Sequence, residues 1–401
     1  MSEWKEVKLG DVAELIKDKY SPQKGDGLFY IGLEHIQEQS LRLNGIGCSD
    51  NITSNKFYFE EGDILFGKLR PYFRKVIIPK FSGVCSTDIW VVRSKNGVDQ
   101  KYLFYLFANK EFVDLSNSGE AGTRMPRADW NFMSQSLWNI PNSKEEQKVI
   151  ASVLSSLDDK IDLLHRQNET LEAMAETLFR QWFVEETDDG WEKTTLDQHI
   201  EVFRGISYKG SGLTERDFGL PMHNLNSVCE GGGYKYEGIK FYKGEYKEKH
   251  LINSRDIIVT NTEQGHEFKL IGFPAVVPDL FGNLGLFSQH IYKICPKKQT
   301  YLSREFIYYL LMTPLVREQI ISATNGSTVN MLAIDGLQRP EFQLPPKETI
   351  IKFTRIIEGY WKKKDVNRKQ VYTLEQLRDT LLPKLISGEV RVDYKDQRGS
   401  D

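Results

Sequence analysis

The chain has 401 residues, of which 40% are hydrophobic and 27% charged, and its formal net charge is −3. This balance predicts a folded protein of two or three domains and excludes a disordered chain. Apolar runs stay shorter than the roughly 18 residues of a transmembrane helix, and the N-terminus shows no signal pattern, so we expect a cytoplasmic protein without membrane contact. Four cysteines without metal-ligand spacing predict no metal site.

The distribution of glycine, proline and apolar residues divides the chain into five segments. Two of them mix strand-like and helix-like runs, and each is followed by a strongly periodic segment without internal glycine-rich turns. In chain order we predict a first domain over 1–142, a helix over 143–186, a second domain over 187–345, a helix over 346–392 and a polar tail over 393–401.

The first periodic segment carries the seam of a coiled coil, because its apolar residues alternate steps of four and three. The second segment keeps the same phase but is interrupted by Lys364, Asn367 and Arg378. The predicted seam comprises Ile150, Leu154, Leu157, Ile161, Leu164, Asn168, Leu171 and Leu178 in the first helix, and Phe353, Ile357, Tyr360, Val371, Leu374 and Leu381 in the second.

The simplest arrangement pairs these two helices with each other, since they match in length and each needs an apolar partner. A rod of roughly 50 Å would result and would hold two domains apart. A buried Asn168 would then fix the register at some loss of stability. The alternative is that each helix packs only on its own domain or on another chain.

The second half of the chain repeats the first. Leu171–Leu178 and Leu374–Leu381 both read L-E-x-[ML]-x-[ED]-T-L, and Tyr102–Phe107 matches Phe306–Leu311 at almost the same offset. Solenoid repeats are only about 20–50 residues long, so this is a duplicated domain. Between the matching stretches the halves share little, which is expected if a common framework carries surfaces that read two different things.

The first candidate segment for nucleic-acid binding is Lys68–Lys75, which holds four cations and no carboxylate, with aromatic residues between them. Such cations can neutralise phosphates, and arginine can read guanine through two hydrogen bonds. The alternative is an edge strand protected from aggregation by its charges.

Two further kinds of segment point the same way. The loops 118–127 and 324–330 are glycine turns with hydroxyl groups, suited either to phosphate contact or to capping a helix. The segment 260–266 takes the place of the basic run in the second half, and its amides could pair with adenine, though a plain polar hairpin would look the same. The candidates for DNA contact are Lys68, Arg70, Tyr72, Arg74, Lys75, Thr123, Arg124 and Arg127, then Thr260, Asn261, Thr262, Gln264, His266, Lys269, Asn325, Ser327, Thr328 and Asn330.

Enzyme motifs are missing from the sequence. It contains no phosphate-binding G-x-x-x-x-G-K-[ST] loop, no Asn/Asp-Pro-Pro-aromatic amino-methylation motif and no paired histidines. Asp63 followed by Gly67-Lys68 lacks the second acidic residue of a metal-dependent nuclease. We therefore predict a protein without a catalytic site and without a cofactor of its own.

With two variable domains, each followed by a similar helix, the chain resembles the specificity subunit of Type I restriction-modification systems over almost its whole length. The resemblance is carried by Leu157–Leu164, by Leu178–Phe183 and by Leu385–Val392, together with the duplication. It implies an α+β fold with two tandem α/β target recognition domains, separated by two helices that pair as an antiparallel coiled coil.

The resemblance also implies function. Each recognition domain would read one half of a split double-stranded DNA target, and the coiled coil would set the spacer between the halves. Two methyltransferase subunits would dock on the helices and bring S-adenosylmethionine, and two motor-nuclease subunits with ATP and magnesium could join them. The rival hypotheses are a scaffold that recruits protein partners without reading DNA, and a specificity subunit serving another phage-defence effector.

Overall fold

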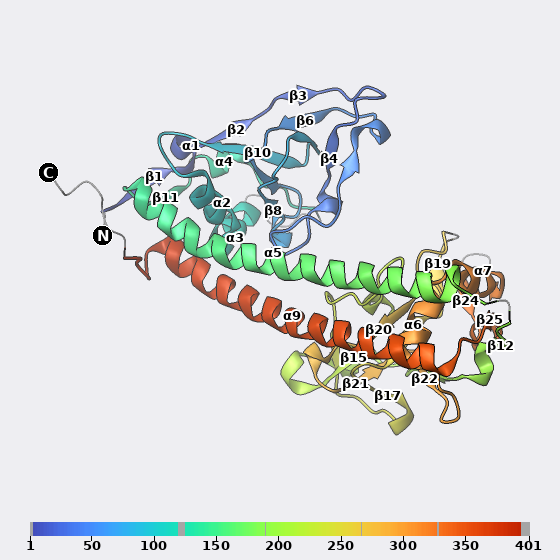
Figure 1. The fold of residues 1–401 in the computed structure, drawn as a ribbon. Helices are drawn as coiled ribbons and strands as arrows, with labels where there is room; N and C mark the ends of the chain where they lie inside the picture. The colour runs from blue at the N-terminus through green and yellow to red at the C-terminus, as the bar shows by residue number, and fades with distance from the viewer. Residues whose placement is uncertain (1–2, 119–124, 189, 266, 327–328, 394–401) are drawn as a thin grey trace. The chain divides into compact units, whose positions relative to one another are not determined.

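The computed structural model describes residues 3–118, 125–188, 190–265, 267–326 and 329–393. The chain forms two compact units (Figure 1). Unit 1 runs to Leu163 and resumes at Val371, and unit 2 spans Leu164–Gln370. Each unit therefore contains an α+β module and one stretch of each long helix.

Unit 1 builds its module from two sheets and a strand pair. The strand orders are β2-β10-β7-β8 and β3-β6-β9-β4-β5, and β1 pairs with β11. The strands are β1 (Trp4–Lys8), β2 (Ala13–Ile16), β3 (Lys19–Tyr20), β4 (Phe29–Ile31), β5 (Gly47–Cys48), β6 (Lys56–Phe59), β7 (Ile64–Gly67), β8 (Val76–Ile77), β9 (Gly83–Cys85), β10 (Ile89–Ser94) and β11 (Leu137–Pro141). The α-helices of the module are α1 (Leu9–Val12), α2 (Gln100–Ala108), α3 (Lys110–Ser118) and α4 (Trp130–Met133).

Unit 2 repeats this plan and adds a small third sheet. Its strand orders are β13-β22-β18-β20, β14-β16-β15-β21-β17 and β19-β24-β23, and β12 pairs with β25. The strands are β12 (Lys193–Thr195), β13 (Ile200–Arg204), β14 (Leu213–Thr214), β15 (Leu220–His223), β16 (Lys240–Tyr242), β17 (Leu251–Asn253), β18 (Ile257–Thr260), β19 (Thr262–Gln264), β20 (Pro274–Val276), β21 (Leu284–Phe287), β22 (Ile291–Pro296), β23 (Thr324–Asn325), β24 (Val329–Leu332) and β25 (Glu341–Gln343). The α-helices of this module are α6 (Arg304–Met312), α7 (Pro314–Ser322) and α8 (Ile334–Gln338).

Equivalent residues begin the core helix of each module. Asp99 accepts a hydrogen bond from the backbone N–H of Tyr102 at the start of α2, and Ser303 does the same for Phe306 at the start of α6. The aromatic stretches that follow are buried in the core of their own unit, as expected for repeated framework residues.

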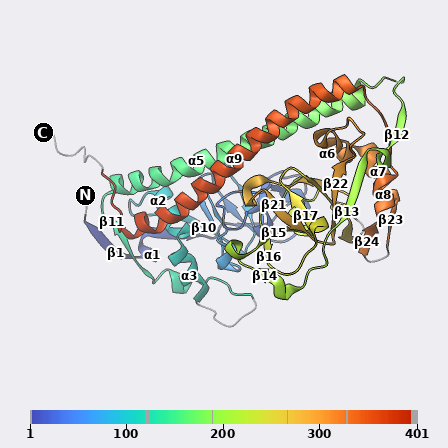
Figure 2. The ribbon, with the colours of Figure 1, turned by 90° about the horizontal axis from the view of Figure 1, so that it is seen from below.

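The two long helices are α5 (Lys144–Arg180), which continues as a π-helical turn over Gln181–Glu185, and α9 (Lys347–Ser387). They lie side by side in both views (Figure 1, Figure 2). Inside unit 2 they are antiparallel, because Glu172 pairs with Lys364 while the earlier His165 contacts the later Arg368. None of the described helices is long and apolar enough to cross a membrane.

The predicted seam faces the partner helix or the module. Ile150, Leu154 and Ile161 are buried in unit 1, and Leu164, Phe353 and Ile357 are buried in unit 2. The pairing of the two helices as an antiparallel coiled coil, expected from the resemblance, is confirmed. The seam residues Leu157, Leu171, Leu178, Tyr360, Leu374 and Leu381 are partly buried, and Val371 is buried.

Candidate nucleic-acid interface

In unit 1, two segments singled out separately in the sequence lie against each other. The basic run Lys68–Lys75 connects β7 to β8, and Leu69 forms a β-bridge with Arg127. The backbone N–H of Arg70 donates to the carbonyl of Pro126 at 2.8 Å, and that of Ala128 donates to Lys68 at 2.9 Å. The basic run and the end of the glycine loop therefore form one continuous surface.

Unit 2 joins its two candidate segments in the same way. Strand β19, which is separated from β18 by Asn261 alone, pairs with β24, and β24 pairs with β23. The backbone N–H of Leu332 also donates to the carbonyl of Asn261 at 2.9 Å. Both units thus place a hairpin segment and a glycine-loop segment next to each other, although their side chains differ.

Part of the predicted set in unit 1 is accessible to a ligand. Tyr72 is 41% exposed, and Lys68 and Arg70 are partly exposed. The side chain of Arg127 is 49% exposed, and its Nε lies 3.4 Å from Asp88. These groups can meet phosphates or base edges.

Arg74 is placed differently. It is only 8% exposed, and its Nε donates to the carbonyl of Ala108 at 2.7 Å while its Nη1 donates to Asp379 at 3.1 Å. Burial lowers the pKa of the guanidinium, and Asp379 offsets part of that effect. Because its donors are turned inward, this placement does not support the predicted DNA contact, and Arg74 acts inside the unit.

Lys75 is also turned into the unit. Its side chain is 14% exposed, its Nζ donates to the carbonyl of Leu33 at 2.8 Å, and it lies 3.6 Å from Glu38. Like Arg74, it holds the turn and is not available to a phosphate in this arrangement. The sequence pattern placed both cations on the surface because local alternation does not reveal which charges find partners.

Two residues of unit 2 that were predicted to contact DNA are also turned into their unit. Thr260 is fully buried, and its hydroxyl donates to the carbonyl of Leu270. Asn261 is 5% exposed, and its Nδ2 donates to the carbonyl of Gln289 at 3.0 Å. Their polar groups close the base of the hairpin, so this placement does not support a direct contact with adenine.

Thr262 and Asn330 are buried as well. The hydroxyl of Thr262 lies 3.3 Å from Nδ1 of His290, and Nδ2 of Asn330 donates to the carbonyl of Gly265. The predicted residues that remain accessible are Asn325, which is exposed, and Lys269, whose side chain is 56% exposed. Lys269 forms an ion pair with Glu267, which raises the pKa of the lysine.

Five predicted residues, Thr123, Arg124, His266, Ser327 and Thr328, lie outside the described residues. Gln264 lies in β19, but its side chain is also outside the described part.

Sequence reasoning missed the carboxylate that organises the hairpin loop of unit 2. Glu263 is only 8% exposed, and it accepts hydrogen bonds from the backbone N–H groups of Lys269 and Leu270 at 3.0 Å and of Ile271 at 2.7 Å. Such bonds satisfy a buried carboxylate and fix the backbone that donates them. Nothing in the local sequence separates Glu263 from an exposed glutamate.

Arg317 of α7 completes this arrangement. Its guanidinium donates to the carbonyl of Ile271 at 2.7 Å and to that of Phe268 at 3.2 Å, and its Cζ lies 3.5 Å from the centre of the Phe273 ring. Burial lowers the pKa of Arg317 to about 10. The loop is therefore held by charged groups of the α+β module itself.

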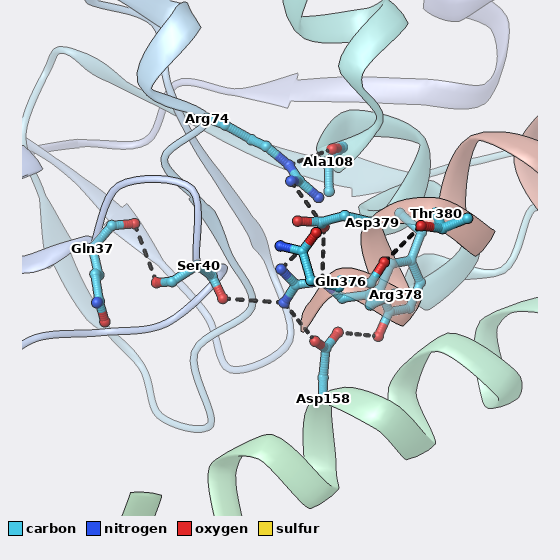
Figure 3. Close-up of polar contacts among 10 residues, drawn as sticks. Gln37, Ser40, Arg74, Ala108, Asp158, Gln376, Arg378, Asp379 and Thr380 are labelled. Atoms are coloured by element: carbon cyan, nitrogen blue, oxygen red, sulfur yellow. Dashed lines mark hydrogen bonds and ion pairs between the residues drawn. The ribbon is translucent and has the colours of Figure 1, made fainter. Parts of the chain in front are cut away.

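In unit 1 a charged network joins the basic run to both long helices (Figure 3). Arg378 of α9, with a side chain 1% exposed, donates to Asp158 of α5 at 2.9 Å and to its neighbour Asp379 at 3.1 Å. Burial acts to lower the pKa of Arg378, but the two carboxylates raise it overall. The hydroxyl of Tyr105 donates to the other oxygen of Asp158 at 2.6 Å.

The corresponding tyrosine of unit 2 also contacts a helix. Tyr309 donates to Glu172 of α5 at 3.1 Å, and Glu172 forms an ion pair with Lys364 of α9. One turn away, Nδ2 of Asn367 donates to Oδ1 of Asn168 at 2.9 Å. Polar residues that interrupt the heptad pattern therefore face each other in pairs.

The described residues contain no group of three or more His, Cys, Asp or Glu side chains placed to hold a metal ion. Asp63, considered above as a nuclease carboxylate, is buried and forms an ion pair with Arg93 at 2.6 Å.

Two α+β units with matching hairpin and loop surfaces define an internally duplicated binding protein. The model of the family described as the Type I restriction modification DNA specificity domain matches residues 1–173 and 217–377. The chain therefore belongs to the family of Type I restriction-modification specificity subunits, whose role is DNA sequence specificity and which are not themselves catalytic.

Relatives agree with this assignment. The chain is 27% identical over 322 residues to the Type I restriction enzyme MjaIX specificity subunit of Methanocaldococcus jannaschii, covering 75% of this chain and 71% of the relative. It is 24% identical over 463 residues to the HindI specificity subunit of Haemophilus influenzae, covering 97% and 100%. The fold is similar to the solved Type I restriction-modification S subunit from M. genitalium, with a TM-score of 0.55, 14% identity and coverage of 98% and 97%.

Proposed function

We propose that each recognition module, 1–142 and 187–345, reads one half of a bipartite double-stranded DNA target. The observation that carries this proposal is the repeated pairing of a hairpin segment with a glycine-loop segment, in unit 1 through Leu69 and Arg127 and in unit 2 through β19 and β24. A repeated framework with different side chains suits a target whose two halves differ in sequence.

The accessible side chains suggest different chemistry for the two halves. In unit 1, Lys68, Arg70 and Arg127 offer cations for phosphates or guanine, and Tyr72 offers an aromatic face. In unit 2, Asn325 offers an amide for adenine and Lys269 a cation for a phosphate. The net charge of −3 is small and negative, so partner subunits would supply much of the positive surface that DNA requires.

The partners in this proposal are two methyltransferase subunits that dock on α5 and α9 and methylate adenine in the cytoplasm. S-adenosylmethionine would bind to those subunits, and ATP with magnesium would bind to motor-nuclease subunits in a restricting complex. This chain would contribute sequence recognition and the spacing between half-sites, and would hold no cofactor of its own.

A salt titration separates DNA reading from a scaffold that only recruits proteins. DNA binding by the complex of this chain with its methyltransferase should weaken steeply as salt rises, because cations release counterions from phosphates. Lys68→Ala should lower the slope of log affinity against log salt by about 1 if Lys68 touches a phosphate, whereas Lys101→Ala, at the exposed start of α2, should leave it unchanged. Binding that is equal with and without this chain would support the scaffold instead.

A further inference from the structure

The turn that presents Tyr72 has an unfavourable backbone conformation on both sides. Arg70 has φ of 51° and Arg74 has φ of 49°, and a short 3₁₀ turn over Pro71–Phe73 lies between them. Residues with a Cβ avoid this left-handed region, and they remain there only when surrounding contacts fix the backbone. The turn therefore needs an anchor outside itself.

Arg74 provides that anchor. Its guanidinium is held by the carbonyl of Ala108 at 2.7 Å and by Asp379 at 3.1 Å. A second loop adds support, since Nε2 of Gln39 donates to the carbonyl of Tyr72 at 2.7 Å. The backbone of the turn is thus fixed from α2 and α9.

The anchor continues into both long helices. Asp379 is shared between Arg74 and Arg378, and Arg378 also reaches Asp158 of α5 and the carbonyl of Ser40 at 3.3 Å (Figure 3). The side chain of Arg378 is almost completely buried, so neither carboxylate can change partner without leaving a charge unpaired. The turn, α5 and α9 therefore form one connected arrangement inside unit 1.

Unit 2 fixes its hairpin loop by other means. There the buried carboxylate of Glu263 and the guanidinium of Arg317 bind the loop backbone, and both belong to the recognition module. A disturbance of the helix network in unit 1 should for this reason affect one half-site more than the other.

We propose that Arg74 is a positioning residue for DNA specificity. Through its bonds to Ala108 and Asp379 it holds the strained turn from which Tyr72 and Arg70 read the half-site of unit 1, without touching DNA itself. This inference rests on the proposed reading of one half-site by each unit, and it predicts that the geometry of the guanidinium matters more than its charge.

The test is methylome sequencing of cells that carry the methyltransferase with the wild-type chain or with Arg74→Met, Arg74→Lys, Asp379→Asn or the control Lys101→Met. We expect Arg74→Met to broaden the set of methylated sequences at one half-site by at least tenfold while the other half-site stays as in the wild type. Arg74→Lys should broaden it similarly, because an ammonium cannot bind Ala108 and Asp379 as a planar fork does. Asp379→Asn, a change of nearly the same shape, should give a smaller broadening, and Lys101→Met none.

Three results decide the outcome. Rescue by Arg74→Lys, with a lower salt slope of DNA binding in Arg74→Met, would show that Arg74 is a phosphate contact and would overturn the positioning role. An unchanged motif in both Arg74→Met and Asp379→Asn would overturn it too. If the wild-type chain gives no bipartite motif, the proposed function fails instead. If Arg74→Met does not accumulate as folded protein, the milder Asp379→Asn carries the decision.

Discussion

Individual buried charges in this protein fix backbone segments that could not hold their shape alone. Glu263 accepts three backbone N–H groups, and Arg378 neutralises two carboxylates at the helix pair. Removing Asp158 or Asp379 would leave the buried guanidinium of Arg378 short of a partner, at less than the about 3–5 kcal/mol of a fully buried pair because both carboxylates are partly exposed. These residues therefore stabilise loop geometry at positions that carry recognition.

A buried histidine gives the first prediction, for the pH dependence of stability. His223 of β15 is 1% exposed, its Nδ1 lies 2.8 Å from the hydroxyl of Tyr234, and burial lowers its pKa to about 3. The unfolded chain binds this proton below about pH 6.5 and the folded chain does not, so stability falls with falling pH by about 1.4 kcal/mol per unit. From pH 6.5 to 5 the loss from His223 should be about 2 kcal/mol.

Urea unfolding at pH 7 and pH 5 measures this effect. The side chain of His223→Gln cannot titrate, so the free energy of unfolding of this variant should fall less than that of the wild type between pH 7 and pH 5. The free energies of the two proteins at pH 7 serve as the reference for this comparison. His250→Gln is the comparison variant: this histidine is less buried, so the lowering of its pKa by burial should contribute a smaller part of the pH dependence. An equal loss of stability between the two pH values in wild type and His223→Gln would contradict the assignment.

At the residue scale the sequence identified the segments that meet at the interface but not the side chains that face outward. Lys68 and Arg74 look alike in the sequence, yet one is partly exposed and the other is held by Asp379, more than 300 positions along the chain. That partner can be found only when the fold is known. The interruption of the heptad pattern at Arg378 was the available signal, because a charged seam residue must find a partner.

The long helices show which features can be predicted at the scale of elements. Heptad spacing predicted both helices, and the observed α5 and α9 begin at Lys144 and Lys347, one residue inside the predicted ranges. The pattern could not tell how Lys364, Asn367 and Arg378 would be accommodated. The structure places each opposite a polar side chain of α5, so these residues select the register.

The helix pair provides the second prediction. Removing 165–171 from α5 together with 364–370 from α9 deletes facing heptads centred on the Asn168–Asn367 pair. This shortens each helix by about 10 Å, which is the rise of about three base pairs, so the recognised spacer should become about three base pairs shorter. Both half-site sequences should stay the same, as read by methylome sequencing.

A double variant that keeps the length serves as the control for the deletion. Asn168→Leu with Asn367→Leu alters the seam but removes no residue, and it should retain the wild-type spacer. If the deletion leaves the spacer unchanged while methylation persists, the helices do not act as a ruler.

At the scale of the whole molecule, the repeat is the feature that the sequence predicts best. The sequence match between Tyr105 and Tyr309 predicted that the two residues occupy equivalent positions in the two halves. In the structure each tyrosine donates a hydrogen bond to a carboxylate of α5. The structure of the divergent stretches could not be predicted from their sequence pattern, because a short strand such as β19 depends on β24, which lies far along the chain. What diverges is the surface that we assign to DNA reading.

The most direct test of this assignment compares adenine methylation in cells that express the methyltransferase partner with and without this chain. With the chain present, methylated adenines should lie in one asymmetric motif of two defined half-sites separated by a spacer of fixed length. Without it, that motif should be unmethylated. Methylation that is the same in both strains, or a motif with a single continuous recognition sequence, would contradict the account of two units that each read one half of the target.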